Sequence, residues 1–245
     1  MTSLNVLTGT VQTRRHSILY TGPDEGPFLL EGRGIAVTRI EKAFKTAFIK
    51  DAQLVGKYQF PRLRKTSLIP GKIIPFNFLI GYKKRKNVCV HFFIDDYQFE
   101  RVWATPLRYV SALSDCAGAI GPDYSLLSTM STAQRIWNCY RNMALSYWMQ
   151  SFGMEVIPVV EWGVKEDLEW CVDGIPKNSV IAIETYGANK NCLSRYSLLK
   201  GFECVCKKLE PLAVIAYGSR IKEMEGLCRR IVWFDTYCKV MKERL

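Results

Sequence analysis

The feature that most constrains the fold is an alternation of short apolar runs with longer amphipathic segments from residue 88 onward. A helix between two strands returns the chain to the same edge of a sheet, so this order predicts parallel pairing. Runs that are apolar throughout are typical of strands buried on both faces. The apolar runs are residues 88–94, 117–122, 156–160, 180–183, 212–216 and 231–234, and the helical segments between them are residues 100–114, 131–152 and 193–209.

These runs, with one or two more strands from the first 87 residues, approach the strand number of a β/α barrel. We therefore predict an α/β, barrel-like domain, complete or distorted, over residues 66–245. Residues 1–65 are predicted to be a basic N-terminal extension, partly irregular, with a helix over residues 40–55. A further strand is expected over residues 76–80. The alternative is a doubly wound open parallel sheet, although no G-x-G-x-x-G follows any of the runs.

Length and composition favour one soluble globular protein. A chain of 245 residues with 48% hydrophobic residues can bury one large core. No apolar run reaches the roughly 18 residues that a membrane span needs, and no signal peptide is evident. The nine cysteines include no C-x-x-C pair, so we expect free thiols, no zinc site and a cytoplasmic protein without a membrane partner.

Carboxylates follow most of the apolar runs directly. In either architecture the reactive groups belong at the carboxyl ends of the strands. Carboxylates that share a cavity can divide the roles of general acid and general base, because repulsion and burial separate their pKa values. They can also hold Mg²⁺, which prefers oxygen ligands. The catalytic candidates are Asp95, Asp96, Asp123, Glu161 and Glu184. The alternative for each acid is a helix cap or a pair with a nearby arginine.

The segment over residues 131–151 carries polar residues that a core helix does not need for stability. An arginine there can bind a carboxylate or a phosphate with two hydrogen bonds, or form an internal salt bridge. Trp162 at a strand end is expected to stack on a ligand. His91, inside a strand, is expected to be packed and hydrogen-bonded. The substrate-binding candidates are Arg101, Ser125, Arg135, Asn138, Arg141, Asn142, Trp162, Tyr186 and Tyr217.

The net charge of +11 is concentrated in the first third of the chain. Residues 1–90 hold 16 Lys and Arg against 5 Asp and Glu, whereas residues 91–245 hold 18 of each. A localised basic region predicts a polyanionic partner such as nucleic acid, or else a solvated basic surface. The nucleic-acid-binding candidates are Arg62, Arg64, Lys65, Lys83, Lys84, Arg85 and Lys86.

Several segments together resemble an uncharacterised family of bacterial and phage proteins, catalogued only as a domain of unknown function. The resemblance covers residues 69–220. It implies a prophage or mobile-element setting and a bacterial host cell, and it supplies no activity. The segments are His91-Phe92-Phe93-Ile94-Asp95-Asp96-Tyr97-Gln98-Phe99-Glu100-Arg101-Val102-Trp103, Pro122-Asp123-Tyr124-Ser125-Leu126, residues 134–142, and residues 150–158 followed by Trp162.

Three functions stay open at this point. The first is an enzyme that uses the strand-end carboxylates on a nucleotide or nucleic acid, by hydrolysis or by glycosyl or phosphoryl transfer. The second is a non-catalytic nucleic-acid-binding protein, whose binding should weaken steeply with salt. The third is a phage–host interaction protein whose acidic residues have only structural roles.

Overall fold

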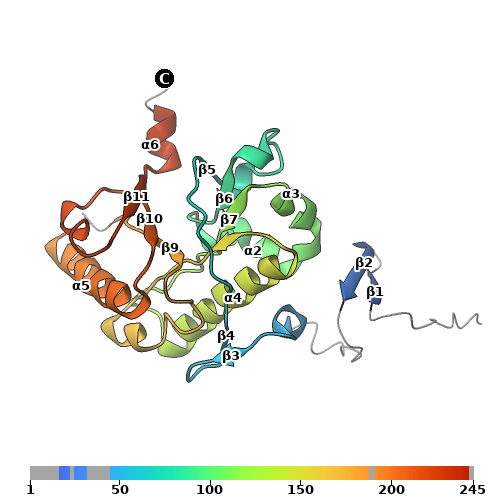
Figure 1. The fold of residues 1–245 in the computed structure, drawn as a ribbon, viewed down its shortest axis with the longest axis horizontal. Helices are drawn as coiled ribbons and strands as arrows, with labels where there is room; N and C mark the ends of the chain where they lie inside the picture. The colour runs from blue at the N-terminus through green and yellow to red at the C-terminus, as the bar shows by residue number, and fades with distance from the viewer. Residues whose placement is uncertain (1–16, 23–24, 32–44, 188–190, 243–245) are drawn as a thin grey trace, which may run out of the picture. The chain divides into compact units, whose positions relative to one another are not determined.

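The computed structural model describes residues 17–22, 25–31, 45–187 and 191–242 (Figure 1). Contacts divide the chain into two compact units, residues 1–47 and 48–245. In the first unit, β1 (Ser17–Gly22) and β2 (Glu25–Glu31) form an antiparallel hairpin in which Tyr20 lies opposite Phe28.

The second unit is α/β, and its main strands are parallel, as predicted. One sheet contains β5 (Ile73–Pro75), β6 (Cys89–His91), β7 (Gly118–Ile120) and β8 (Val156–Ile157) in that order. The other contains β9 (Val180–Glu184), β10 (Ala213–Tyr217) and β11 (Ile231–Phe234), also in chain order. A parallel bridge between Val159 and Ala182 joins the two sheets. This sequential order lacks the reversal that defines a doubly wound sheet.

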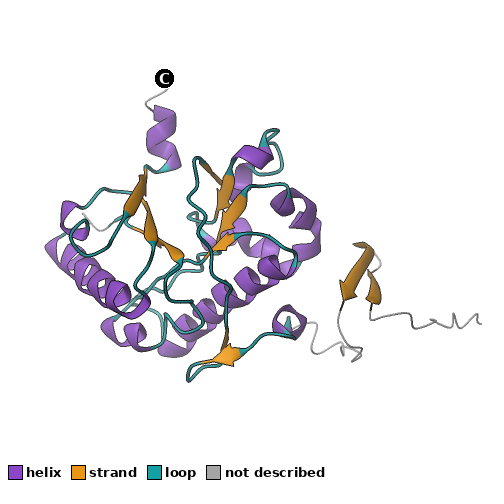
Figure 2. Cartoon of the chain, in the orientation of Figure 1, coloured by secondary structure: helices purple, strands orange, loops and turns teal. Residues whose placement is uncertain are grey.

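The helices lie outside the strands, as Figures 1 and 2 show. Helix α4 begins with a capping box in which Ser131 Oγ accepts from the Gln134 backbone N–H and the Gln134 side chain accepts from the Ser131 N–H. None of the helices in the described part of the chain has the length and apolar character needed to cross a bilayer. The helices are α2 (Asp96–Ala104), α3 (Val110–Ser114), α4 (Thr132–Ser151), α5 (Cys192–Leu209) and α6 (Tyr237–Lys242).

The strands β6, β7, β8 and β10 are buried throughout, and β9 is buried except at Glu184, which explains the continuous apolar character of these runs. One cluster of apolar side chains draws on strands of both sheets and includes Ile120, Ile157, Ala182 and Ile215. Two further clusters fill the space between the strands and the helices, and α4 contributes to both of them.

The two end strands approach each other through side chains. Phe78, just after β5, stacks on Tyr237, just after β11, with ring centroids 4.8 Å apart. Ile73 of β5 and Val232 of β11 both pack against the same apolar cluster. Among the described residues no backbone pairing joins β5 to β11, so a barrel stays a prediction.

Two predicted elements are absent, and packing explains both. The part of the predicted helix 40–55 that is described forms a short 3₁₀ helix (Thr46–Ile49) and β3 (Leu54–Val55), which pairs with β4 (Phe60–Pro61). Residues 76–78 form a 3₁₀ helix instead of a strand, because Phe76 turns inward to stack on Phe92 at 5.1 Å. Residues 40–44 lie outside the described residues.

Candidate functional site

The carboxyl ends of the parallel strands bring together four of the five predicted catalytic residues. Asp96 follows β6, Asp123 follows β7, Glu161 follows β8, and Glu184 ends β9. The negative charges of Glu161, Glu184 and Asp96 all raise the pKa of Asp123. The fifth residue, Asp95, is exposed at the start of α2 and accepts a hydrogen bond of 3.2 Å from Gln98.

Asp123 and Glu161 form a buried carboxyl pair at the centre of this group. Asp123 is 9% exposed, and the two carboxyl groups lie close enough for a proton on one of them to be shared with the other. Burial is the main cause that raises the pKa of both acids, and the charges of the neighbouring carboxylates add to it.

The pair is compatible with a shared proton. Asp123 Oδ1 and Glu161 Oε2 are both buried, and neither has a hydrogen-bond donor when both groups are ionised. One proton between these two oxygens satisfies both of them. Because the pKa values of both acids are raised, the pair favours holding a proton that its members share, and such a pair can serve in general acid–base chemistry.

Side chains hold the backbone of the loop that carries Asp123. Asn142 Oδ1 accepts from the Tyr124 N–H at 2.7 Å, and Asn142 Nδ2 donates to the Tyr124 carbonyl at 3.2 Å. Asp96 accepts from the Ser125 hydroxyl at 2.9 Å and from the Ser125 N–H. Such bonds fix the position of Asp123 before any ligand binds.

The next two backbone groups of this loop are held in the same way. Asn138 Nδ2 donates to the Ser125 carbonyl at 2.7 Å, and Glu161 Oε1 accepts from the Leu126 N–H at 3.0 Å. Glu161 therefore uses one oxygen to hold the loop and presents the other to Asp123. The predicted substrate-binding residues Ser125, Asn138 and Asn142 all have this positioning role in the structure.

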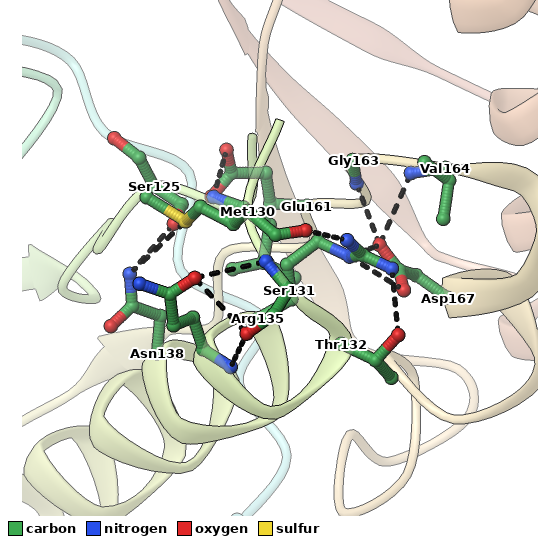
Figure 3. A network of polar contacts seen from close by, with 12 residues as sticks. Ser125, Met130, Ser131, Thr132, Arg135, Asn138, Glu161, Gly163, Val164 and Asp167 are labelled. Atoms are coloured by element: carbon green, nitrogen blue, oxygen red, sulfur yellow. Dashed lines mark hydrogen bonds and ion pairs between the residues drawn. The ribbon is translucent and has the colours of Figure 1, made fainter. Parts of the chain in front are cut away.

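Arg135 forms a buried ion pair with Asp167 (Figure 3). Its Nε lies 2.9 Å from Asp167 Oδ2, and its other nitrogens donate to the Met130 carbonyl and to Thr132 Oγ1. Asp167 is fully buried and also accepts from the backbone N–H groups of Gly163 and Val164 at 3.0 and 3.1 Å. This network fixes the segment that follows Glu161, so Arg135 has a structural role.

The other two predicted substrate arginines also have intramolecular partners. Arg141 pairs with Glu100 at 2.8 Å, donates to Asn138 Oδ1 at 2.9 Å, and lies 3.5 Å above the Tyr124 ring. The Arg101 guanidinium lies over the rings of Phe76 and Tyr109. The internal salt bridge that the sequence left open for Arg141 therefore forms, with a glutamate as its partner.

Three aromatic candidates have different surroundings. Trp162 packs on α5 at Gly201, where an added Cβ would lie 2.2 Å from the indole, so its ring serves the core. Tyr217 is buried, stacks on Phe93 at 4.9 Å, and accepts at its hydroxyl from the Tyr237 N–H at 3.0 Å. Tyr186 is 67% exposed beside Glu184.

His91 is packed, as expected from its position in a strand. Its Nδ1 accepts from the Phe93 N–H at 3.2 Å, and its ring contacts Tyr217 with centroids 4.7 Å apart. Burial lowers its pKa to about 3, so the ring is neutral.

The predicted nucleic-acid contacts lie at the opposite edge of the sheet, where the strands begin. Arg64 donates to the Gln150 carbonyl at the end of α4, Arg62 to Gln53, and Arg85 to the carbonyls of Leu79 and Ile80. The remaining predicted contacts, Lys65, Lys83, Lys84 and Lys86, are exposed.

Within the described residues no group of three or more His, Cys, Asp or Glu is arranged to hold a metal ion. Two of the clustered acids already accept hydrogen bonds from the Asp123 loop, Asp96 from Ser125 and Glu161 from Leu126. Binding of Mg²⁺ stays a prediction.

Sequence reasoning missed Asp167 and Gln150, which hold the framework of the site. Asp167 lies in the charged run Lys165-Glu166-Asp167, where no pattern separates it from its exposed neighbours. Gln150 accepts from the Arg64 N–H and donates to the Arg64 carbonyl. A polar residue on the apolar face of α4 is the signal that identifies Gln150.

Comparison with known proteins confirms the resemblance. The family model described as "Domain of unknown function (DUF4417)" matches residues 52–235. The chain is 32% identical to the "Gene 1 protein" of Mycobacterium phage L5 over 163 residues, which are 66% of this chain and 71% of the relative. It is 31% identical to the "Gene 1 protein" of Mycobacterium phage D29, over 66% of this chain and 60% of the relative. No solved structure matches the chain.

Proposed function

The chain belongs to the family of the domain of unknown function DUF4417, and we propose that it is an enzyme whose acid–base group is the Asp123–Glu161 pair. The substrate class is a nucleotide or nucleic acid, and the favoured reaction is cleavage or transfer at its glycosidic bond. The observation that carries this proposal is the pair of buried carboxyl oxygens, Asp123 Oδ1 and Glu161 Oε2, which have no hydrogen-bond partner and which a shared proton would satisfy.

The charges around the pair favour a glycosidic bond over a phosphoryl group. Glu184 and Asp96 add negative charge close to the pair, and Arg101, Arg135 and Arg141 have partners of their own. A phosphoryl group at this point would be repelled without a cation to neutralise it. Cleavage of a glycosidic bond instead develops positive charge on the sugar, which carboxylates stabilise.

The geometry assigns roles to the acids. Asp123 and Glu161 are in hydrogen-bond contact, which is closer than the roughly 5 Å between the two carboxyls of a retaining glycosidase, so no substrate fits between them. In the proposed hydrolysis they act as one proton-sharing unit that protonates the departing base as the glycosidic bond breaks. Water then bonds to the sugar carbon and returns a proton to the pair. Glu184, which is exposed at the end of β9, would stabilise the positive charge that develops on the sugar. Asn138 and Asn142 position the unit through the loop.

Two broader statements belong to the same proposal. The stacking of Phe78 on Tyr237 supports a distorted barrel that side chains close between β5 and β11. The phage relatives and the free state of the nine cysteines support a protein that works in the reducing cytoplasm of a bacterial host cell, from a prophage or other mobile element.

The test uses a panel of ribonucleosides, deoxyribonucleosides, their 5′-monophosphates and a single-stranded oligonucleotide, with chromatography of the released base. We expect the wild type to release base from at least one substrate class, and Asp123→Asn and Glu161→Gln to lose this activity. Asp95→Asn, which removes an exposed carboxylate at the same edge, is the matched control and should remain active. Wild-type inactivity on the whole panel, or full activity of Asp123→Asn, would overturn the proposal.

A further inference from the structure

Exposed cations without partners gather where the parallel strands begin. Lys65 lies on the segment that leads into β5, Lys83, Lys84 and Lys86 lie on the turn before β6, and Arg229 and Arg230 directly precede β11. All six are exposed, and among the described residues none of their charged groups has a hydrogen-bond or ion-pair partner. Parallel strands place these positions at one edge, which we call the amino edge.

The acidic residues at the amino edge do not neutralise the positive charge of these six residues. Asp115 pairs with Arg85 at 3.4 Å, Glu155 accepts from Thr66 Oγ1 at 2.6 Å, and Glu210 pairs with Lys177 at 3.6 Å. The six cations therefore remain available to an external anion.

The backbone beneath these cations is fixed. Next to Lys65, Thr66 accepts from the Val180 N–H at its carbonyl and donates its own N–H to Ser179 Oγ at 3.0 Å. The turn that carries Lys83, Lys84 and Lys86 is held by the bonds from Arg85 to the Leu79 and Ile80 carbonyls.

The arginine pair is anchored in the same way. The Arg230 carbonyl accepts from the Val214 N–H at 2.9 Å, at the first residue pair of β10 and β11. Because this backbone is already ordered, less conformational entropy is lost when a ligand binds to it. Long, flexible side chains on such a backbone are suited to contact a regular array of phosphates.

The opposite edge has a different charge pattern. On the segments that follow the carboxyl ends of β9, β10 and β11, Arg195, Arg220 and Lys239 each pair with a carboxylate at 2.7 Å. The Asp123–Glu161 pair adds acid to that edge. A polyanion is therefore attracted more strongly to the amino edge than to the carboxyl edge.

The cations before β6 and β11 belong to one sector of the unit, whereas Lys65 lies beside the start of β9, where the Thr66 carbonyl accepts from the Val180 N–H. β5 pairs directly with β6, and the residues after β5 and β11 meet in the Phe78–Tyr237 stack. Arg229 and Arg230, which the sequence did not single out, therefore extend the basic surface that Lys83, Lys84 and Lys86 begin.

We propose that the amino edge is a binding surface for the phosphate backbone of nucleic acid, formed by Lys65, Lys83, Lys84, Lys86, Arg229 and Arg230 and separate from the Asp123–Glu161 pair. Lysine and arginine contacts of this kind are made to phosphate groups and not to bases, so binding does not depend on the nucleotide sequence. The surface goes beyond the proposed enzymatic function and does not depend on it.

The experiment measures fluorescence anisotropy of a labelled single-stranded oligonucleotide and of a labelled duplex, at salt concentrations from about 50 to about 200 mM. We expect Lys83→Ala/Lys86→Ala and Arg229→Ala/Arg230→Ala each to weaken binding and to reduce the slope of log affinity against log salt by about 2, one for each lost phosphate contact. Lys165→Ala/Lys222→Ala removes two exposed lysines from segments that follow the carboxyl ends of β8 and β10, and it should bind as the wild type does.

Two results would overturn this proposal. One is that the wild-type protein binds neither oligonucleotide probe at about 50 mM salt. This result counts against the proposal even if the protein binds vesicles that contain an anionic phospholipid. The other is an equal loss of affinity in the control pair and in the amino-edge pairs. Asp123→Asn should retain full binding, so failure of the proposed enzymatic function and failure of this surface are distinguishable.

Discussion

Replacing Asp123 with asparagine should change how the stability of the protein depends on pH. The asparagine amide can donate to Glu161 Oε2 without a shared proton, so the hydrogen bond is kept while the repulsion between two acids is removed. Glu161 then needs no proton to be satisfied, and its pKa falls.

The direction of the pH dependence follows from the pH at which the folded and unfolded states release their carboxyl protons. The unfolded chain releases carboxyl protons near pH 4, whereas the folded pair, in which the pKa of Glu161 is raised to about 8, keeps at least one. Between these values the folded state holds more protons, so the free energy of unfolding falls by at least about 1.4 kcal/mol per pH unit. From about pH 6.5 to about pH 8 the wild type should lose about 2 kcal/mol from this source.

The pH window excludes the effect of His91. The pKa of His91 is lowered to about 3 in the folded state and is about 6.5 in the unfolded chain, so its contribution changes only below about pH 6.5. Urea unfolding monitored by circular dichroism at several pH values gives the free energy of unfolding for both proteins. We expect Asp123→Asn to show a smaller slope than the wild type in this window, because one titrating acid is removed and the pKa of Glu161 falls, and to be the more stable protein at about pH 8. Equal slopes in the wild type and the variant would refute the shared proton.

Three further predictions concern stability. Asp167→Ala leaves Arg135 buried without its carboxylate and should lower the free energy of unfolding by about 3–5 kcal/mol in urea titrations; a loss below about 1 kcal/mol would contradict the network in Figure 3. Gly201→Ala places a Cβ against Trp162 and should cost about 1–3 kcal/mol, whereas Gly71→Ala, which meets nothing within 4 Å, should be close to neutral in the same thermal unfolding assay. The free energy of unfolding of the wild type should fall as the pH falls from about 6.5 toward 3, in part because His91 is neutral in the folded state, and His91→Gln should abolish this part of the loss. If the variant loses as much stability over this pH range as the wild type, His91 is not held neutral by burial.

Elements with strong periodicity were predictable from the sequence. The helix over residues 131–152 is confirmed as α4, because its apolar spacing and the Ser131–Gln134 cap agree. The six apolar runs after residue 88 all contain strands, since parallel strands buried on both faces need continuous apolar residues. Parallel pairing in turn places Asp96, Asp123, Glu161 and Glu184 at one edge.

The partners of the polar residues were not predictable in the same way. Asn138, Asn142 and Asp96 bind main-chain atoms of residues 124–125, and main-chain atoms carry no signature in the sequence. An arginine that holds a carboxylate within the protein looks the same in sequence as one that awaits a phosphate. The helix predicted over residues 40–55 is absent from its described part, residues 45–55, for a related reason. Phe48 is placed by its contacts with Trp103 and Trp148, both at 5.4 Å, and not by helical spacing.

The shared proton of Asp123 and Glu161 is tested most directly by carbon-13 NMR titration of the side-chain carboxyls in protein labelled at aspartate and glutamate. The structure predicts two carboxyl signals that titrate well above the usual range near pH 4; in Asp123→Asn the Asp123 signal is absent and the pKa of Glu161 is lower than in the wild type. If every carboxyl signal of the wild type instead completes its titration below about pH 5.5, the two acids are independently ionised and no acid–base pair exists at this edge.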